Sequence, residues 1–263
     1  MRQHLRRLYL LYHELRPGGS GYSYVIDTSL FEKHVDLFVK LRAAGSGSLG
    51  LWPAVTFDDG HISNYDLAAP VLLARGLSAH FFITVGWTGT KAGYMGWDEL
   101  RALHGAGHTI GAHGWTHTLL THCGDTELQK ELSGAKRELE DRLGAAVTTM
   151  SLPGGRYDRR VLAACVAAGY AHVYTSEPRA EAMPLGATVG RLNIRGDAQV
   201  EWMERLLDPA SGVLKGLERQ ERMKAAAKRL LGDRLYARLW ALANRQESGG
   251  DGDEAHTGGG CCM

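Results

Sequence analysis

Two adjacent carboxylates follow a short apolar stretch in the first quarter of the chain. Residues 55–57 are Val, Thr and Phe, and Asp58, Asp59 and Gly60 come directly after them. Side chains alternate between the two faces of a strand, but both carboxylates can point into one pocket where the strand gives way to a turn. Gly60 supplies the backbone freedom for that turn. The pattern is typical of acid–base or metal chemistry, with an ordinary Asp-Gly turn as the alternative.

Two histidines four residues apart supply a second set of polar side chains. His113 and His117 belong to the stretch HGWTH, and one turn of helix would place both imidazoles on the same side. With one aspartate they make three protein ligands and leave a fourth position open, which is typical of catalytic rather than structural zinc sites. A histidine pair alone would more simply belong to a surface helix or the core, but the aspartate pair in the same chain favours a metal site.

The two stretches, in this order and at this separation, resemble the first two motifs of the polysaccharide deacetylases, the NodB-homology carbohydrate esterases of family 4. TFDDG is similar to the first motif and HGWTH to the second. The resemblance implies that Asp59, His113 and His117 bind a divalent metal, and that Asp58 is the catalytic base. Zinc is the expected ion, and cobalt, nickel or manganese could occupy the same ligands.

The third family motif is present only in part. Family members typically carry Arg-x-Pro-aromatic-Gly, and this chain reads SLPGG. The resemblance implies that Pro153 and Gly154 contact the substrate, with the Gly154 N–H donating to the oxyanion of the intermediate. Ser151 stands in place of the arginine that usually orients the catalytic aspartate. Arg156 or Arg191 could reach that aspartate instead, and the sequence does not choose between them.

Two later family motifs are missing. Asp-x-x-x-Trp is not found after Gly169, and residues 191–194 (RLNI) occupy the region where Leu-x-His usually supplies the general acid. His13 and His61 both follow predicted strand ends and could replace that histidine, although either could be an ordinary loop residue. The resemblance therefore covers about residues 8–200.

Predicted strands and helices alternate along the chain, which is typical of parallel βαβ units. Ser29 is the expected N-cap of the first helix, with Glu32 in the capping-box position. The candidate ligands come just after strand ends, where α/β barrels carry their chemistry. The resemblance implies a distorted, incomplete (β/α) barrel of the NodB-homology type. Strands are expected at 8–12, 51–57, 79–85, 108–110, 147–152 and 171–175, and helices at 29–44, 66–75, 97–104, 126–143 and 159–168.

Three segments are expected along the chain. Residues 1–210 form the deacetylase-like domain, and residues 211–245 form a basic helical segment that packs on it. The alternative for this helix is contact with an anionic membrane surface through its basic face. Residues 246–263 are rich in glycine and polar residues, and we expect them to be disordered.

Composition limits the compartment and the partners. The net charge is +1, which gives no support for a nucleic-acid partner. The four cysteines form neither a disulfide framework nor a CxxC pattern, so a reducing compartment is expected. The basic and apolar N-terminus is too short for a signal peptide, and no apolar run approaches the length of a membrane span. We therefore expect a cytoplasmic protein.

The function favoured by these residues is hydrolysis of an amide on a sugar. The first hypothesis is a metal-dependent hydrolase that removes N-acetyl groups from N-acetylated sugars of a polysaccharide or its precursor. The second keeps the metal but takes a small amide, such as a formamido or acetamido sugar on a lipid or nucleotide carrier. The third is a sugar-binding homologue without catalysis, suggested by the missing general-acid histidine.

Overall fold

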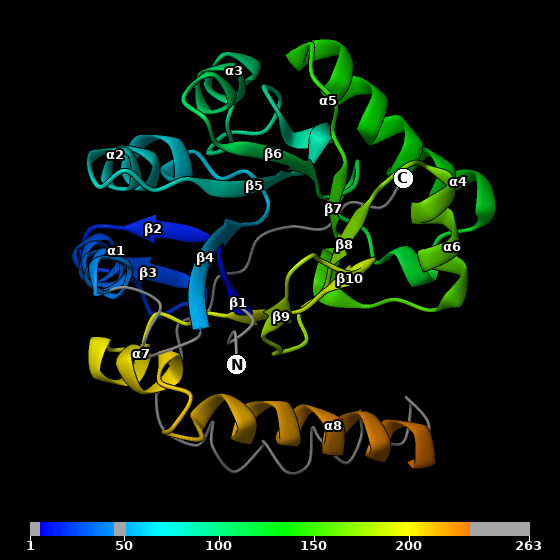
Figure 1. Cartoon of the computed structure of the whole chain (residues 1–263). Coiled ribbons are helices and arrows are strands. Elements are labelled where there is room, and N and C mark those ends of the chain that lie inside the picture. The colour runs from blue at the N-terminus through cyan, green and yellow to red at the C-terminus, as the bar shows by residue number, and fades with distance from the viewer. Residues whose placement is uncertain (1–5, 45–50, 232–263) are drawn as a thin grey trace, which may run out of the picture. The chain divides into compact units, whose positions relative to one another are not determined.

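The computed structural model describes residues 6–44 and 51–231, and its main feature is a curved sheet with helices on the outside (Figure 1). Within these residues nine strands form one sheet, in the order β10-β8-β7-β6-β5-β4-β1-β11, and β9 pairs with β1. The pairs along this order are parallel, whereas β9 is antiparallel to β1. The strands are β1 (Arg6–Tyr12), β4 (Leu51–Phe57), β5 (Ala79–Ile83), β6 (Thr109–Ala112), β7 (Thr149–Ser151), β8 (His172–Tyr174), β9 (Glu181–Ala182), β10 (Thr188–Val189) and β11 (Arg191–Asn193).

A single residue joins the two ends of this strand order. β10 pairs with β8 and β11 pairs with β1, and only Gly190 separates β10 from β11. A Cβ on Gly190 would lie 2.6 Å from the carbonyl oxygen of Glu177, so a side chain there would clash with backbone. One extended segment thus bridges the first and last strands and nearly closes the barrel. The predicted fold class, a distorted and incomplete (β/α) barrel, is confirmed.

Helices α1 to α6 cover the outer side of the barrel (Figure 1). α4 and α5 are joined by a π-type turn over Lys130–Gly134, so the helix predicted at 126–143 is one continuous helical run. Two short strands, β2 (Glu14–Arg16) and β3 (Val25–Asp27), pair in a separate small sheet. The helices are α1 (Thr28–Ala43), α2 (Ala69–Ala74), α3 (Trp97–Gly105), α4 (Asp125–Gln129), α5 (Ala135–Leu143), α6 (Arg159–Ala167), α7 (Val200–Leu207) and α8 (Val213–Leu231).

Two helix starts differ from the sequence prediction. The carboxylate of Asp27 caps α1 by accepting hydrogen bonds from the N–H groups of Ser29 (2.6 Å) and Leu30 (3.3 Å), so the prediction of Ser29 as N-cap was wrong. The helix predicted from Asp66 begins earlier, with a π-type turn over Asn64–Ala68. Asn64 donates its side-chain N–H to the carbonyl of His13 at 2.6 Å, a long-range contact that sequence periodicity does not reveal.

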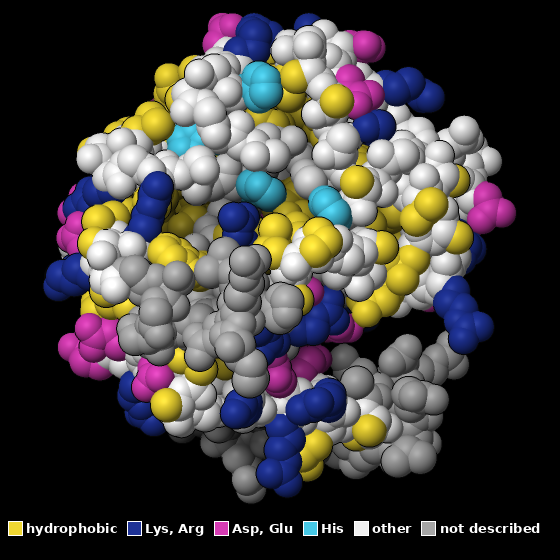
Figure 2. Space-filling view, viewed as in Figure 1, with side chains coloured by type: hydrophobic (Ala, Val, Ile, Leu, Met, Phe, Trp, Pro, Cys, Tyr) yellow, Lys and Arg dark blue, Asp and Glu magenta, His cyan; other side chains and the backbone are white. Residues whose placement is uncertain are grey.

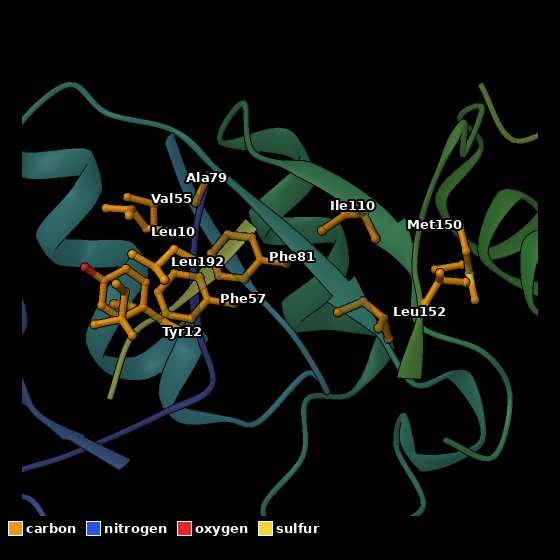
Figure 3. Close-up of a cluster of buried hydrophobic side chains, with 14 of the residues drawn as sticks. Leu10, Tyr12, Val55, Phe57, Ala79, Phe81, Ile110, Met150, Leu152 and Leu192 are labelled. Carbon is orange, nitrogen blue, oxygen red and sulfur yellow. The ribbon is translucent and has the colours of Figure 1, made fainter. Parts of the chain in front are cut away.

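The apolar core lies mainly between the strands and the helices, and a smaller cluster fills the barrel. The rings of Phe57 and Phe81 stack in the outer core with centroids 5.1 Å apart (Figure 3). Neighbours along a strand face opposite sides, so Phe82 points the other way and packs with Tyr9 and Tyr174. The interior of the barrel is therefore aromatic as well as apolar.

The C-terminal part is divided from the rest of the chain near residue 218. Within the described residues, one compact unit ends at Glu218 and a second begins at Arg219. The boundary predicted at residue 210 and the packing of segment 211–245 on the domain stay predictions. The tail at 246–263 and the end of the basic segment lie outside the described residues. Among the helices that the structure describes, none has the length and apolarity needed to cross a membrane.

Charged side chains of both signs are mixed on the face shown in Figure 2. Lys and Arg side chains lie between Asp and Glu side chains around its periphery. This mixture is what a net charge of +1 leads us to expect.

We predict that Phe81→Ala lowers the free energy of unfolding by about 3–5 kcal/mol, because a fully buried ring leaves a cavity behind. Leu73→Ala is the control, since Leu73 is 47% exposed on α2, and its effect should stay within about 0.5 kcal/mol. Urea denaturation followed by circular dichroism measures both. Equal effects would show that the stacked pair does not lie in the core.

Candidate active site

The candidate site lies at the carboxyl ends of the parallel strands. Asp58 and Asp59 follow β4, His113 follows β6 and Ser151 ends β7. β4 pairs with β5, β5 with β6 and β6 with β7, all in parallel. Because the carboxyl ends of parallel strands share one edge, these side chains meet although they are far apart in sequence.

Asp59, His113 and His117 form a compact group of metal-ligand atoms. Asp59 Oδ1 lies 3.3 Å from His113 Nε2 and 3.2 Å from His117 Nε2, and the ligand atoms of all three lie within 4.8 Å of one another. Asp59 Oδ1 is buried and accepts no hydrogen bond from the residues that the structure describes. Two imidazole nitrogens and a carboxylate oxygen without a donor fit one divalent cation.

The two histidines lie on a turn, so the prediction that a helix brings them together was wrong. His113 follows directly on β6, and the turn after it places Gly114 at φ 78° and His117 at φ 66°. Asp59 is also left-handed, with φ 73°. This conformation is unfavourable for a residue with a side chain, and it occurs here at two of the three candidate ligands. The imidazoles converge because the backbone reverses between them.

The ring of His113 is oriented by a second hydrogen bond. Its Nδ1 lies 2.9 Å from the carbonyl oxygen of Ser151, so Nδ1 carries the proton and donates it. Nε2 is then left with a lone pair on the side of Asp59. Such a contact fixes both the tautomer and the direction of a metal-binding histidine.

A buried glutamate that sequence reasoning missed holds the histidine turn. Glu131 is 1% exposed and lies in the π-type turn between α4 and α5. Its carboxylate accepts hydrogen bonds from the N–H of Trp115 (2.7 Å) and from the N–H (3.0 Å) and hydroxyl (2.7 Å) of Thr116. A Cβ on Gly114 would lie 2.8 Å from Glu131 Oε2, so the contact requires glycine there. The carboxylate thus stabilises the turn between the two histidines.

The sequence contains a pattern that indicates that Glu131 is buried. It stands three residues after Leu128 and four before Ala135, which places a charged group on the apolar face of its helix. A carboxylate at such a position is rarely buried without donors. That pattern predicts a buried polar contact but not its partner.

Asp58 is held by an arginine, and the structure shows which one. Arg191 Nη1 donates to Asp58 Oδ1 at 2.7 Å, and Arg191 Nη2 donates to Asp58 Oδ2 at 2.8 Å. The Ser151 hydroxyl donates to Asp58 Oδ2 at 2.9 Å and accepts from Arg191 Nη2 at 2.7 Å. Arg156, the other candidate, has an exposed side chain. Ser151 and Arg191 therefore both hold Asp58 through hydrogen bonds, and Arg191 also supplies the positive charge that balances the carboxylate.

Arg191 is itself fixed inside the barrel. It is fully buried, and its Nε donates to the carbonyl of Thr175 at 3.1 Å. Its guanidinium lies 5.3 Å from the ring centre of Phe82 and 5.8 Å from that of Tyr174, within cation–π range. Arginine can be buried at such a site because its flat group pairs with both oxygens of a carboxylate.

The pKa of Asp58 reflects this pairing. Burial raises the pKa of the carboxyl, but the charge of Arg191 and the hydrogen bonds that Arg191 donates lower it by more. The net result is a pKa below the ordinary value of an aspartate. Asp58 is therefore an ionised carboxylate with a fixed orientation.

A pocket of about 450 Å³ opens beside these groups. Gly154 lines it at φ 63°, and a Cβ there would lie 2.7 Å from Leu119 Cδ2. Pro153, the residue before Gly154, is buried. The pocket is lined by Leu11, His13, Glu14, Tyr22, Tyr24, Asp58, Asp59, His61, Tyr94, His113, His117, Leu152, Gly154, Gly155, Ser176 and Asn193.

His13 and His61, the candidate proton donors, both line the pocket but differ in their contacts. His61 Nδ1 lies 2.8 Å from the hydroxyl of Ser63, and its Nε2 lies 3.9 Å from a carboxylate oxygen of Glu14. His13 Nδ1 is buried and has no hydrogen-bond partner among the described residues. Burial lowers the pKa of His13, and the charges of Asp58 and Asp59 oppose that effect. Of the two histidines, His13 is therefore the one with a buried ring nitrogen that makes no hydrogen bond to the described residues.

Residues 53–173 match the family described as polysaccharide deacetylase. The Bacillus subtilis (strain 168) protein YxkH, whose curated name provisionally assigns it to the polysaccharide deacetylases, is 30% identical over 132 residues. The match covers 50% of this chain and 47% of YxkH, so the chain spans about half the length of this curated relative.

Solved deacetylase structures share the fold. The Streptococcus pyogenes deacetylase PplD, determined in complex with acetate, superposes with a TM-score of 0.68 at 17% identity, covering 78% of this chain and 100% of that chain. A polysaccharide deacetylase from Bacillus cereus superposes with a TM-score of 0.67 at 20% identity, covering 78% of this chain and 70% of that chain. The NodB-type barrel predicted from the first two motifs is therefore confirmed.

We predict that Glu131→Ala weakens zinc binding about 10–100-fold, because the turn that presents His117 loses its anchor. Isothermal titration calorimetry, in competition with a chelator of known zinc affinity, measures the dissociation constant for zinc. Circular dichroism checks that the variant is folded. Glu138→Ala is the control, since Glu138 lies on α5 and pairs with Arg142 at 2.9 Å, away from the turn. Unchanged zinc affinity in a folded Glu131→Ala variant would contradict the role of Glu131.

Proposed function

We propose that this protein is a metal-dependent hydrolase that removes N-acetyl groups from N-acetylated sugars of a polysaccharide or its precursor. The observation that carries the proposal is the joint geometry of the two aspartates. Asp59 faces two imidazoles with an oxygen that accepts no hydrogen bond from the described residues, while Asp58 beside it is bound by Arg191. A metal ligand and a separate base are what amide hydrolysis by activated water requires.

Asp59, His113 and His117 are the residues proposed to hold the cation. When bound, a divalent cation polarises an acyl oxygen and acidifies a water molecule. Zinc fits two imidazoles and a carboxylate, and cobalt, nickel or manganese fit the same set. The backbone at Asp59 and His117 is already in the conformation that brings the three side chains together, so binding requires little rearrangement.

Asp58 is proposed as the base that takes the proton from the attacking water. Arg191 keeps this carboxylate ionised and fixes its direction. Gly154 lines the pocket, and its N–H is the proposed donor to the oxyanion, with Pro153 setting the turn behind it. His13 is the proposed donor of a proton to the leaving amine, because its Nδ1 has no hydrogen-bond partner among the described residues.

Four further expectations stay predictions. The altered third motif and the missing late motifs are compatible with a small formamido or acetamido sugar on a carrier, and a sugar-binding homologue without catalysis is the remaining alternative. A cytoplasmic location and contact of the basic C-terminal segment with a membrane are tested by none of the described residues.

The central test is acetate release from N-acetylglucosamine oligomers by the zinc-loaded protein. Asp58→Asn should lower kcat about 10²–10⁴-fold while the zinc content stays at one ion per chain, because the base is lost and the ligands remain. His117→Ala should lose zinc as well as activity. Full turnover by Asp58→Asn would refute the assignment of Asp58 as the catalytic base. Binding of the oligomers by the wild-type protein without any acetate release would support the alternative of a sugar-binding homologue without catalysis.

A second test separates the charge of Arg191 from its geometry. Arg191→Lys keeps a cation but cannot bind both oxygens of Asp58, so kcat should fall about 100-fold with little change in zinc affinity. Ser151→Ala is the matched control and should lower kcat less than about tenfold, because both contacts from Arg191 to Asp58 remain. Equal effects of the two variants would show that paired contact with Asp58 is not what matters.

A further inference from the structure

The two candidate histidine ligands are oriented in different ways. His113 is buried, and its Nδ1 is fixed by the carbonyl of Ser151. The side chain of His117 is 34% exposed, and its Nδ1 makes no hydrogen bond to the described residues. An imidazole without such a bond can turn about its side-chain torsions and direct Nε2 away from a cation. Another contact is therefore needed to set the direction of the His117 ring.

The indole of Trp87 supplies such a contact. Its ring centroid lies 5.1 Å from that of His117, with the two planes inclined at 33°, which is close to an offset stack. Trp87 is half-buried and ends the short 3₁₀ turn Val85–Trp87, which follows β5. The roles proposed so far for the site use no residue of this turn.

The turn under the indole is bonded to the histidine turn. The N–H of Val85 donates to the carbonyl of Gly114 at 3.1 Å, and the N–H of Gly86 donates to the carbonyl of Trp115 at 2.8 Å. A Cβ on Gly86 would lie 2.6 Å from the carbonyl oxygen of Trp115, so only glycine allows the two backbones to approach this closely. The indole and the imidazole therefore project from two backbone segments with a fixed separation.

A lysine holds the indole on its own loop. Lys91 Nζ lies 3.6 Å from the ring centre of Trp87 and 4.3 Å from that of Tyr94, within cation–π range. The two rings are 4.7 Å apart at 61°, and the N–H of Lys91 donates to the carbonyl of Trp87 at 3.0 Å. The indole therefore cannot turn away from His117 without losing its contacts with Lys91 and Tyr94.

We propose that Trp87 is a positioning residue for His117: the flat face of the indole keeps the imidazole turned toward the cation site and so sets the affinity for a divalent cation. The inference rests on the proposed function for the role of His117 as a metal ligand. Stacking requires a flat partner but no hydrogen bond, which suits a ring that is partly exposed to water. The shape of the Trp87 side chain, rather than its indole N–H, therefore carries the role.

Trp87→Leu and Trp87→Phe test the flat face, because both remove the indole but only phenylalanine keeps a ring. The Kd for zinc, measured in competition with a chelator, should rise about tenfold for Trp87→Leu and stay within about threefold for Trp87→Phe. Trp202→Leu is the control and should leave the Kd unchanged, since Trp202 is a half-buried indole on α7, which packs against α1. Equal zinc affinity in the two Trp87 variants would overturn the proposal.

Lys91→Met separates the hold on the indole from simple charge repulsion. The change removes a positive charge near the site, and the loss of repulsion alone would tighten zinc binding. Release of the Trp87 ring predicts the opposite, a Kd about two- to fivefold higher. Tighter or unchanged zinc binding in a folded Lys91→Met variant would refute the role of Lys91.

Crystal structures of the metal-free protein give a readout that a general loss of stability would not change. The His117 ring should keep one orientation in the wild type and in Trp87→Phe, and should turn away from Asp59 in Trp87→Leu. The same ring orientation in Trp87→Leu as in the wild type would overturn the proposal. These outcomes are independent of the proposed reaction: if the wild type releases no acetate but the ring turns and zinc affinity falls as stated, only the hydrolase fails.

Discussion

A buried arginine and a buried carboxylate neutralise each other at the carboxyl ends of the barrel strands, and the rest of the site depends on that pair. Arg191 is fully buried and Asp58 is 3% exposed. Neither charge would be stable there alone, because an unpaired buried ion costs several kcal/mol. Arg191 occupies both oxygens of Asp58, so the neighbouring Asp59 is the carboxylate with an oxygen available to a cation. One contact thus gives two adjacent, chemically identical residues different proposed roles.

The same short segment of chain closes the barrel and holds Asp58 in position. Gly190 lets the segment from β10 to β11 pass from β8 to β1, and Arg191 is the next residue. Its position is therefore set by the pairing of Tyr9 with Arg191 on neighbouring strands. The same strand ends in Asn193, at the wall of the pocket. Loss of this short strand would remove a barrel contact and the partner of Asp58 together.

The candidate ligands could be recognised from sequence because their residue types and order are local patterns. Asp58, Asp59 and the two histidines needed only a strand end and a short spacing. The helix expected between His113 and His117 was wrong because a left-handed turn, held by Glu131 from a distant helix, brings them together instead. The choice of Arg191 over Arg156 depended on how the barrel closes, and no local pattern encodes that pairing.

The most direct test is a crystal structure of the zinc-loaded protein with an anomalous difference map at the zinc absorption edge. We expect one peak per chain, bound by Asp59, His113 and His117, with both oxygens of Asp58 still paired to Arg191. An Asp58 oxygen bound to the zinc, or a peak away from these three residues, would contradict the separation of the two aspartates into ligand and base.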